Sequence, residues 1–145
     1  MTLVQTGRLL AASALAALSL AACSMFQSGS GGDAMKLSLT GAQEVPPVST
    51  SASGSGTIRV DADGDVSGSV TTKGIQGTAA HIHQAPKGQN GPVIIPLVKN
   101  GDTYSVPSGA KLTEAQMKAY KAGNLYVNVH SAQHKGGELR AQLEP

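Results

Sequence analysis

Residues 56–72 read GTIRVDADGDVSGSVTT, and this stretch indicates the fold class of the chain. The flanks are rich in β-branched residues, and the DADGD between them supplies the Asp and Gly that tight turns require. The stretch therefore predicts an antiparallel hairpin with strands at Gly56–Val60 and Val66–Thr72. The acidic turn lacks the length and the terminal Glu of an EF-hand calcium loop, so we interpret Asp61–Asp65 as a plain hairpin turn.

Further short β-prone runs separated by Gly and Pro predict an all-β sandwich or barrel of about seven or eight strands. Val93–Lys99 is apolar on both faces apart from Pro96, which predicts a buried strand with a bulge or an edge at the proline. Thr113 and Gln116 have the spacing of a capping box, which predicts one short helix. The other expected strands are Met35–Thr40, Thr78–His83, Thr103–Val106, Leu125–His130 and Glu138–Leu143.

The N-terminus has the features of a bacterial lipoprotein signal peptide. Arg8 precedes an uncharged run, Leu9–Ala22, that is rich in Leu, Ala and Ser. A comfortable membrane span needs about 20 strongly apolar residues, so this run fits the apolar region of a signal peptide better. The only Cys of the chain, Cys23, follows Leu20-Ala21-Ala22, which is the lipobox pattern. We expect removal of residues 1–22 and acylation of Cys23, with palmitate among the acyl chains.

Lipidation at Cys23 has consequences for the rest of the chain. It leaves the domain without a free thiol, a disulfide or a Cys metal ligand. Residues 23–34, rich in Ser and Gly, are expected to form a flexible tether, and residues 35–145 a single domain. Ser24 follows the Cys, and the absence of Asp there favours the outer membrane. The expected location is the cell envelope, with the domain facing the periplasm or the exterior and the membrane as a partner.

Composition and charge exclude several classes of function. The formal net charge is only +2, and the basic residues are scattered, so nothing indicates nucleic-acid binding. The chain has no Trp and few aromatic residues, so its core must be built from Val, Ile, Leu and Ala. No Ser-His-Asp order and no pair of carboxylates stands out. We therefore expect no catalytic activity.

All four histidines of the chain lie in the expected β domain: His81, His83, His130 and His134. Side chains alternate along a strand, so His81 and His83 share one face, roughly 6.5–7 Å apart. His-x-His on a strand is a common start for a metal site. In LYVNVH the apolar residues share one face, while Asn128 and His130 share the other. The histidines border Gly-rich loops, where functional residues gather.

Over about residues 36–143 the sequence resembles a known family, the CHRD domain. Three blocks carry the resemblance: Glu44-Val45-Pro46-Pro47, His81-Ile82-His83 with Asn90-Gly91-Pro92, and Asn128-Val129-His130 followed by Gly137-Glu138-Leu139-Arg140. Lys135 and Ala141 are departures, where the family often has Pro and Gly. The resemblance implies an immunoglobulin-like antiparallel β-sandwich in an extracytoplasmic setting. It implies no settled activity.

The leading hypothesis is a metal-binding module for metal sequestration or handling. His81, His83 and His130 would hold copper, with zinc as the second choice and His134 as a candidate fourth ligand, because all-imidazole sites suit these metals. Asn128, Glu138 and Arg140 would orient the imidazoles or close the site. Met117 is a weak candidate for Cu(I), since a Met on a short amphipathic helix more often belongs to the core.

Two other hypotheses stay open. The domain could be a non-catalytic structural or interaction module of the envelope, in which His and Asn pin long loops by hydrogen bonds. A more remote alternative is an enzyme similar to copper-zinc superoxide dismutase, another β-sandwich with His-x-His on a strand. That enzyme uses two metal sites and a disulfide. This chain has too few His for two sites, and its only Cys is expected to be lipidated.

Overall fold

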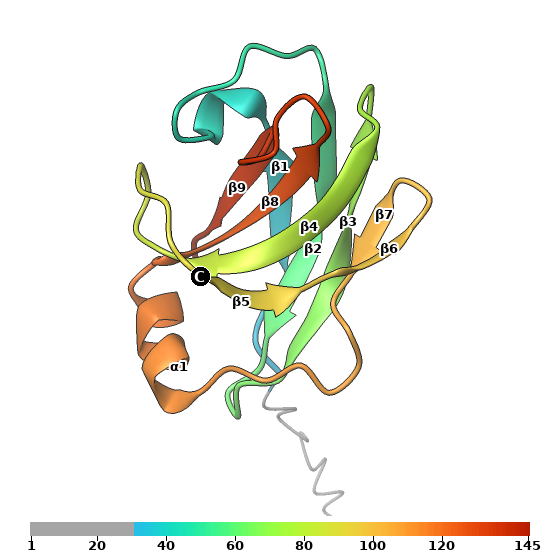
Figure 1. The fold of residues 1–145 in the computed structure, drawn as a ribbon. Helices are drawn as coiled ribbons and strands as arrows, with labels where there is room; N and C mark the ends of the chain where they lie inside the picture. Colours follow the sequence, from blue (N-terminus) through green and yellow to red (C-terminus); the bar gives the residue numbers. More distant parts are fainter. Residues whose placement is uncertain (1–30) are drawn as a thin grey trace, which may run out of the picture.

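The computed structural model describes residues 31–145, which form two antiparallel sheets packed as a β-sandwich with one helix (Figure 1). One sheet has the order β1-β2-β3-β7-β6 and the other β5-β4-β8-β9. The strands are β1 (Met35–Leu39), β2 (Ser53–Val60), β3 (Val66–Lys73), β4 (Gly77–Gln84), β5 (Val93–Pro96), β6 (Val98–Asn100), β7 (Thr103–Ser105), β8 (Leu125–Ser131) and β9 (Leu139–Leu143). A single 3-10 turn, η1 (Gly41–Gln43), follows β1.

The expected signal peptide (residues 1–22), Cys23 and most of the expected tether (residues 23–34) lie outside the described residues. Among residues 31–145, no helix has the length and apolar character to cross a membrane.

The hairpin predicted from residues 56–72 is confirmed. β2 and β3 pair along their whole length, from Ser53 opposite Lys73 to Val60 opposite Val66. The amide of Asp61 donates to the carbonyl of Asp65 at 2.8 Å and closes the turn. Gly64 takes a φ of +93° in that turn, a conformation that costs a glycine little. The local turn chemistry is therefore sufficient to set this register.

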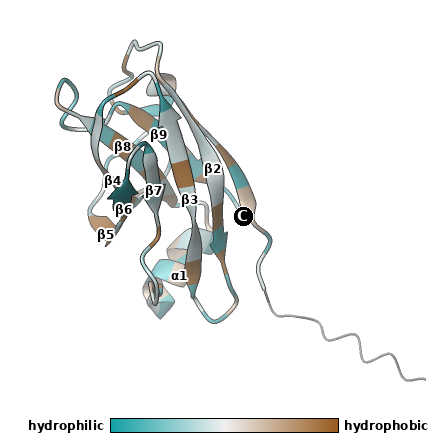
Figure 2. Cartoon of the chain, turned by 90° about the vertical axis from the view of Figure 1, so that its right-hand side faces the viewer, coloured by the Kyte–Doolittle hydropathy of each residue, from teal (hydrophilic) through white to brown (hydrophobic). Residues whose placement is uncertain are grey.

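The segment Val93–Lys99 has the edge expected at Pro96, but it is not the single buried strand that was expected. It forms two short edge strands, β5 and β6, that belong to different sheets. Pro96 has no N–H to offer a further neighbour, so the segment cannot lie inside a sheet. Val93 and Val98 are 49% and 57% exposed. Figure 2 shows the hydrophobic β5 followed by the hydrophilic β6 at this edge.

The core lies between the two sheets. In β8 the side chains of Leu125, Val127 and Val129 are completely or almost completely buried there, and Ile82 of β4 joins the same apolar cluster. Because side chains alternate along a strand, the residues between them point to the outer face of the sheet. That outer face carries the histidines.

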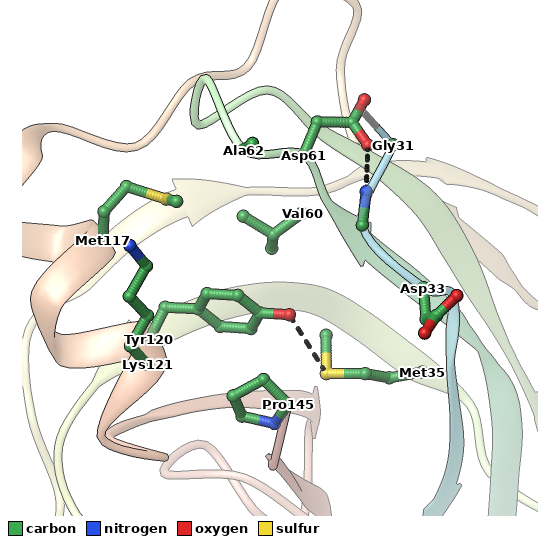
Figure 3. A pocket seen from close by; sticks show the side chains of 11 residues that line it. Gly31, Asp33, Met35, Val60, Asp61, Ala62, Met117, Tyr120, Lys121 and Pro145 are labelled. Carbon is green, nitrogen blue, oxygen red and sulfur yellow. Dashed lines mark hydrogen bonds between the residues drawn. The ribbon is translucent and has the colours of Figure 1, made fainter. Parts of the chain in front are cut away.

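The helix α1 (Glu114–Lys121) has the predicted capping box, because Thr113 and Gln116 exchange side chain–backbone hydrogen bonds. Tyr120 faces β1 and donates to the sulfur of Met35 at 3.8 Å, as Figure 3 shows. Met117 is partly buried against the core, and together with Tyr120 and Met35 it lines a cleft. Its packing agrees with a core role, and no histidine lines this cleft.

Candidate metal centre

Three of the four histidines converge on the outer face of the β5-β4-β8-β9 sheet. His81 and His83 come from β4 and His130 from β8, and these two strands are direct neighbours. One ring nitrogen from each histidine lies within 4.8 Å of the other two, so the group could hold a metal ion. The closest pair is Nδ1 of His81 and Nε2 of His130, 3.0 Å apart. We call these residues the histidine triad.

Two backbone carbonyls determine which ring nitrogen of His83 and of His130 carries the hydrogen. Nδ1 of His83 lies 2.9 Å from the carbonyl oxygen of Gly91, and Nδ1 of His130 lies 2.8 Å from that of Lys135. A carbonyl oxygen can only accept, so both Nδ1 atoms carry the hydrogen. In the neutral rings each Nε2 then has a lone pair. Nε2 of His83 is buried and has no hydrogen-bond partner among the described residues.

The environment favours the neutral form of His81 and His83. Burial lowers the pKa of His81, and the nearby charges of His130 and His83 lower it further. Burial also lowers the pKa of His83, although its hydrogen bond to Gly91 acts in the opposite direction. A metal ligand must be a neutral imidazole, so these two residues need not lose a proton near neutral pH before binding an ion.

The ring of His83 is part of a stack of three side chains. Its neighbour Tyr126 on β8 lies parallel to it, with centroids 4.8 Å apart and planes at 4°. The guanidinium carbon of Arg140 on β9 lies 3.5 Å from the centroid of the Tyr126 ring. Since β8 runs between β4 and β9, Tyr126 is held between the imidazole and the guanidinium. The orientation of His83 is therefore fixed without a metal.

Gly91 connects both rings of this stack. Its carbonyl accepts from His83, and its amide donates to the hydroxyl of Tyr126 at 3.2 Å. A Cβ on Gly91 would lie 1.9 Å from the carbonyl oxygen of Gln84. Such an overlap is impossible without moving the backbone, so the position requires a glycine for its close approach.

The residues expected to orient the imidazoles have different positions. Asn128 lies opposite His81 in the strand pairing, and its side-chain amide donates to the carbonyl of Gly136 at 3.3 Å. Glu138 is not beside the triad. Its two carboxylate oxygens accept from Thr50 at 2.7 Å and from Ser131 at 2.5 Å.

His134 is not part of the triad, although it was a candidate fourth ligand. It lies in the turn between β8 and β9, where its carbonyl accepts from the amides of Ser131 and Gly137. The inward and outward alternation of side chains along β8 ends at this turn. His134 therefore lines a different pocket, together with Glu138. The group of converging ring nitrogens contains only His81, His83 and His130.

Glu44 is a buried acid that the residue pattern did not single out. Its side chain is 3% exposed, and Oε1 has no hydrogen-bond partner among the described residues. Burial raises the pKa of Glu44 from 4.5 to about 7, against the opposing effect of the Arg140 charge. The only signal in the sequence was its place in the Glu44–Pro47 block, which carries no information about burial.

The comparison with protein families decides the identity of the domain. The family model of the CHRD domain matches residues 35–143, most of the chain. The chain belongs to the CHRD family. The resemblance expected from the sequence blocks is thereby confirmed, together with the β-sandwich. No curated protein and no solved structure matched the chain.

The sequence blocks of this CHRD domain meet over the triad face. Asn90 donates to the carbonyl of Val45 at 2.6 Å, which joins the loop between β4 and β5 to the Glu44–Pro47 block. The guanidinium of Arg140 donates to the carbonyl of Gln89 at 2.9 Å and holds the same loop. The blocks therefore build one connected structure around His83 and Tyr126.

Proposed function

We propose that this CHRD domain binds one copper or zinc ion through His81, His83 and His130, and that it serves in metal sequestration or handling in the cell envelope. The observation that carries the proposal is the pair of backbone carbonyls at Gly91 and Lys135. They hold the Nδ1 hydrogens of two imidazoles, which leaves the Nε2 lone pair of His83 free, while Nε2 of His130 accepts from Nδ1 of His81, a hydrogen bond that a bound ion would replace. Metal-binding histidines commonly have such a partner on the other nitrogen.

The chemistry of the triad selects the class of metal. Three neutral imidazoles suit copper and zinc, whereas calcium and magnesium prefer oxygen ligands. Nitrogens that bind one zinc ion at about 2.0–2.1 Å lie roughly 3.3 Å apart in a tetrahedral site. The 3.0 Å between His81 and His130 is close to this value, and in the metal-free protein it is the length of the hydrogen bond between them. The separations reach up to 4.8 Å, so a ring must move inward before one ion can contact all three nitrogens.

We further propose that the domain is tethered to a membrane, in keeping with the lipobox before Cys23. Acylation at one N-terminal residue with more than one chain gives stable anchoring. A domain on such a tether samples a thin layer next to the membrane, which suits the capture of ions that pass through the envelope. The outer membrane is the proposed location, because Ser24 follows the Cys.

Calorimetric titration of the untagged chain beginning at Ser24 with Cu(II) and Zn(II) tests the proposal. We expect one ion per chain with micromolar or tighter affinity, and a loss of about tenfold or more in His83→Ala. The matched control is His134→Ala, which removes a histidine outside the triad and should leave the affinity unchanged. Binding weaker than about micromolar to the wild-type protein would overturn the proposal.

A structural role of the same histidines has its own support. The hydrogen bonds of His83 to Gly91 and of His130 to Lys135 attach two loops to the sheet. In that case His83→Ala lowers the free energy of unfolding by the same amount with and without added copper. For a metal-binding domain, copper stabilises the wild type but not the variant, because an ion that binds the folded state raises its stability.

A further inference from the structure

A second candidate site is lined by residues of η1 and the segment after it, of the loop between β4 and β5, and of β9; Figure 1 shows these elements. It is a cavity of about 360 Å³. One wall is apolar and is formed by Ala42, Val45 and Pro47, while Glu44, Lys87 and Arg140 supply charged groups. None of the triad histidines lines it. Small-molecule sites have volumes of about 300–1,000 Å³, so the cavity fits a small ligand.

Arg140 is a buried cation without an acidic partner. The residue is 1% exposed, yet in the described part of the chain no carboxylate oxygen lies within ion-pair distance of its guanidinium. Its partners are neutral: the carbonyl of Gln89, the side-chain oxygens of Asn90 and Gln142, and the ring face of Tyr126. A buried charge is stabilised most by an opposite charge.

The guanidinium also has donors that no described residue uses. Its three hydrogen bonds to Gln89, Asn90 and Gln142 occupy three of about five N–H groups that an arginine offers. A carboxylate matches the forked geometry of a guanidinium and can accept two hydrogen bonds from it.

The other charged groups at the cavity support an anionic ligand. Glu44 is the acidic residue whose charge interacts with that of Arg140. Burial raises the pKa of Glu44 to about 7, so part of this carboxyl is protonated near neutral pH. In the protonated form it can donate a hydrogen bond to an anion. Lys87 adds a second positive charge, and within residues 31–145 its only ion pair is an exposed contact with Glu144 at 3.3 Å. Such exposed pairs are weak.

We propose that this cavity binds a small organic carboxylate, with the carboxylate group at Arg140 and the apolar part against Val45 and Pro47. The apolar wall favours an organic acid over an inorganic anion, since burial of apolar surface adds to the attraction between charges. The proposal is independent of the metal site, because no histidine of the triad takes part.

The test titrates butyrate or butyramide into the metal-free chain beginning at Ser24, at constant ionic strength. The two compounds share shape and size but differ in charge, and the amide chemical shifts of the protein report binding. We expect butyrate to bind in about the millimolar range and butyramide about tenfold more weakly. The amides that shift should be those of Val45, Lys87 and Gly88. Equal binding of the two compounds, or shifts elsewhere, would contradict the proposal.

Two variants and a competitor sharpen the result. Ala42 is exposed and lines the cavity, so Ala42→Leu should narrow it and weaken butyrate binding by about fivefold without loss of the fold. Ala132→Leu is the matched control, since Ala132 is exposed in a turn outside this cavity, and it should bind butyrate as the wild type does. Inorganic phosphate should compete more weakly than butyrate. Equal competition would overturn the assignment to organic carboxylates.

Discussion

The rings of His83 and Tyr126 lie face to face, 4.8 Å apart and within 4° of parallel. Tyr126 in turn supports the guanidinium of Arg140, and Gly91 forms a hydrogen bond to each of the two rings. One imidazole of the triad is therefore held by a stack on one side and a backbone carbonyl at its edge. From this arrangement we predict the tautomer of His83, the effect of a substitution at Gly91 and the contribution of the stack to stability.

The first prediction concerns the protonation of the imidazoles. Because Gly91 and Lys135 accept from the Nδ1 atoms, the neutral rings of His83 and His130 should both carry their hydrogen on Nδ1. Nitrogen-15 NMR of the metal-free protein above pH 7 distinguishes the two tautomers. His134 is the internal comparison, since neither carbonyl contacts its ring. A hydrogen on Nε2 of either triad residue would show that the carbonyls do not set the tautomer.

The second prediction concerns Gly91. In Gly91→Ala the new Cβ would overlap the backbone of Gln84, so the loop must move and both ring contacts are lost. We expect a loss of about 1–3 kcal/mol in the free energy of unfolding, measured by urea denaturation, together with weaker copper binding. Gly136→Ala is the control: its Cβ would contact nothing within 4 Å, so the change should stay within about 0.5 kcal/mol. Equal effects of the two substitutions would contradict the close approach at Gly91.

The third prediction separates the two contributions of Tyr126. Tyr126→Phe keeps the stack and removes the hydroxyl that accepts from Gly91, which should cost about 1 kcal/mol of stability. Tyr126→Leu also removes the aromatic contacts with His83 and Arg140, which should cost about 1–2 kcal/mol more. Denaturation curves of the three proteins measure both steps. If the Phe and Leu variants were equally stable, the stack would contribute nothing.

The fourth prediction concerns the dependence of stability on pH. Burial raises the pKa of Glu44 from 4.5 to about 7, so the folded protein holds this proton more tightly than the unfolded chain. The stabilising contribution is fully present below about pH 4.5 and is lost as the pH rises to about 7, with a size of up to about 3 kcal/mol. Glu44→Gln keeps a neutral side chain of similar shape and should lack this loss.

Urea denaturation at pH 5 and pH 7.5 makes the comparison. The lowered pKa values of His81 and His83 act in the opposite direction, because their contribution is lost as the pH falls. Both proteins contain these histidines, so the difference between them isolates Glu44. The same change in stability for wild type and variant would mean that Glu44 ionises as freely in the folded state as in the unfolded chain.

Features that depend on neighbouring residues could be predicted from the sequence. The DADGD hairpin and the Thr113–Gln116 capping box are of this kind, because the turn and the cap are made by residues a few positions apart. The division of Val93–Lys99 between two sheets could not be predicted. It depends on which distant strands each half joins, and the apolar pattern of the segment is compatible with one buried strand.

In the candidate site, too, local features could be predicted and those that depend on distant residues could not. Alternation along the strand correctly put His81 and His83 on one face, but the approach of His130 requires the pairing of β4 with β8. The carbonyls of Gly91 and Lys135 belong to loops, whose conformation no periodic pattern records. Glu138 was expected to orient an imidazole or close the site, yet its carboxylate accepts from Ser131 and Thr50.

The division of residues 93–100 into two short edge strands has a consequence for self-association. At the other side of the sandwich, Thr40 and Arg140 exchange backbone hydrogen bonds and close the gap between β1 and β9. The exposed edges at β5 and β6 are only four and three residues long, and they carry Pro96 and Lys99. Short edges with Pro and Lys resist the addition of a strand from another molecule. Many copies crowded on one surface would therefore resist aggregation through their sheet edges.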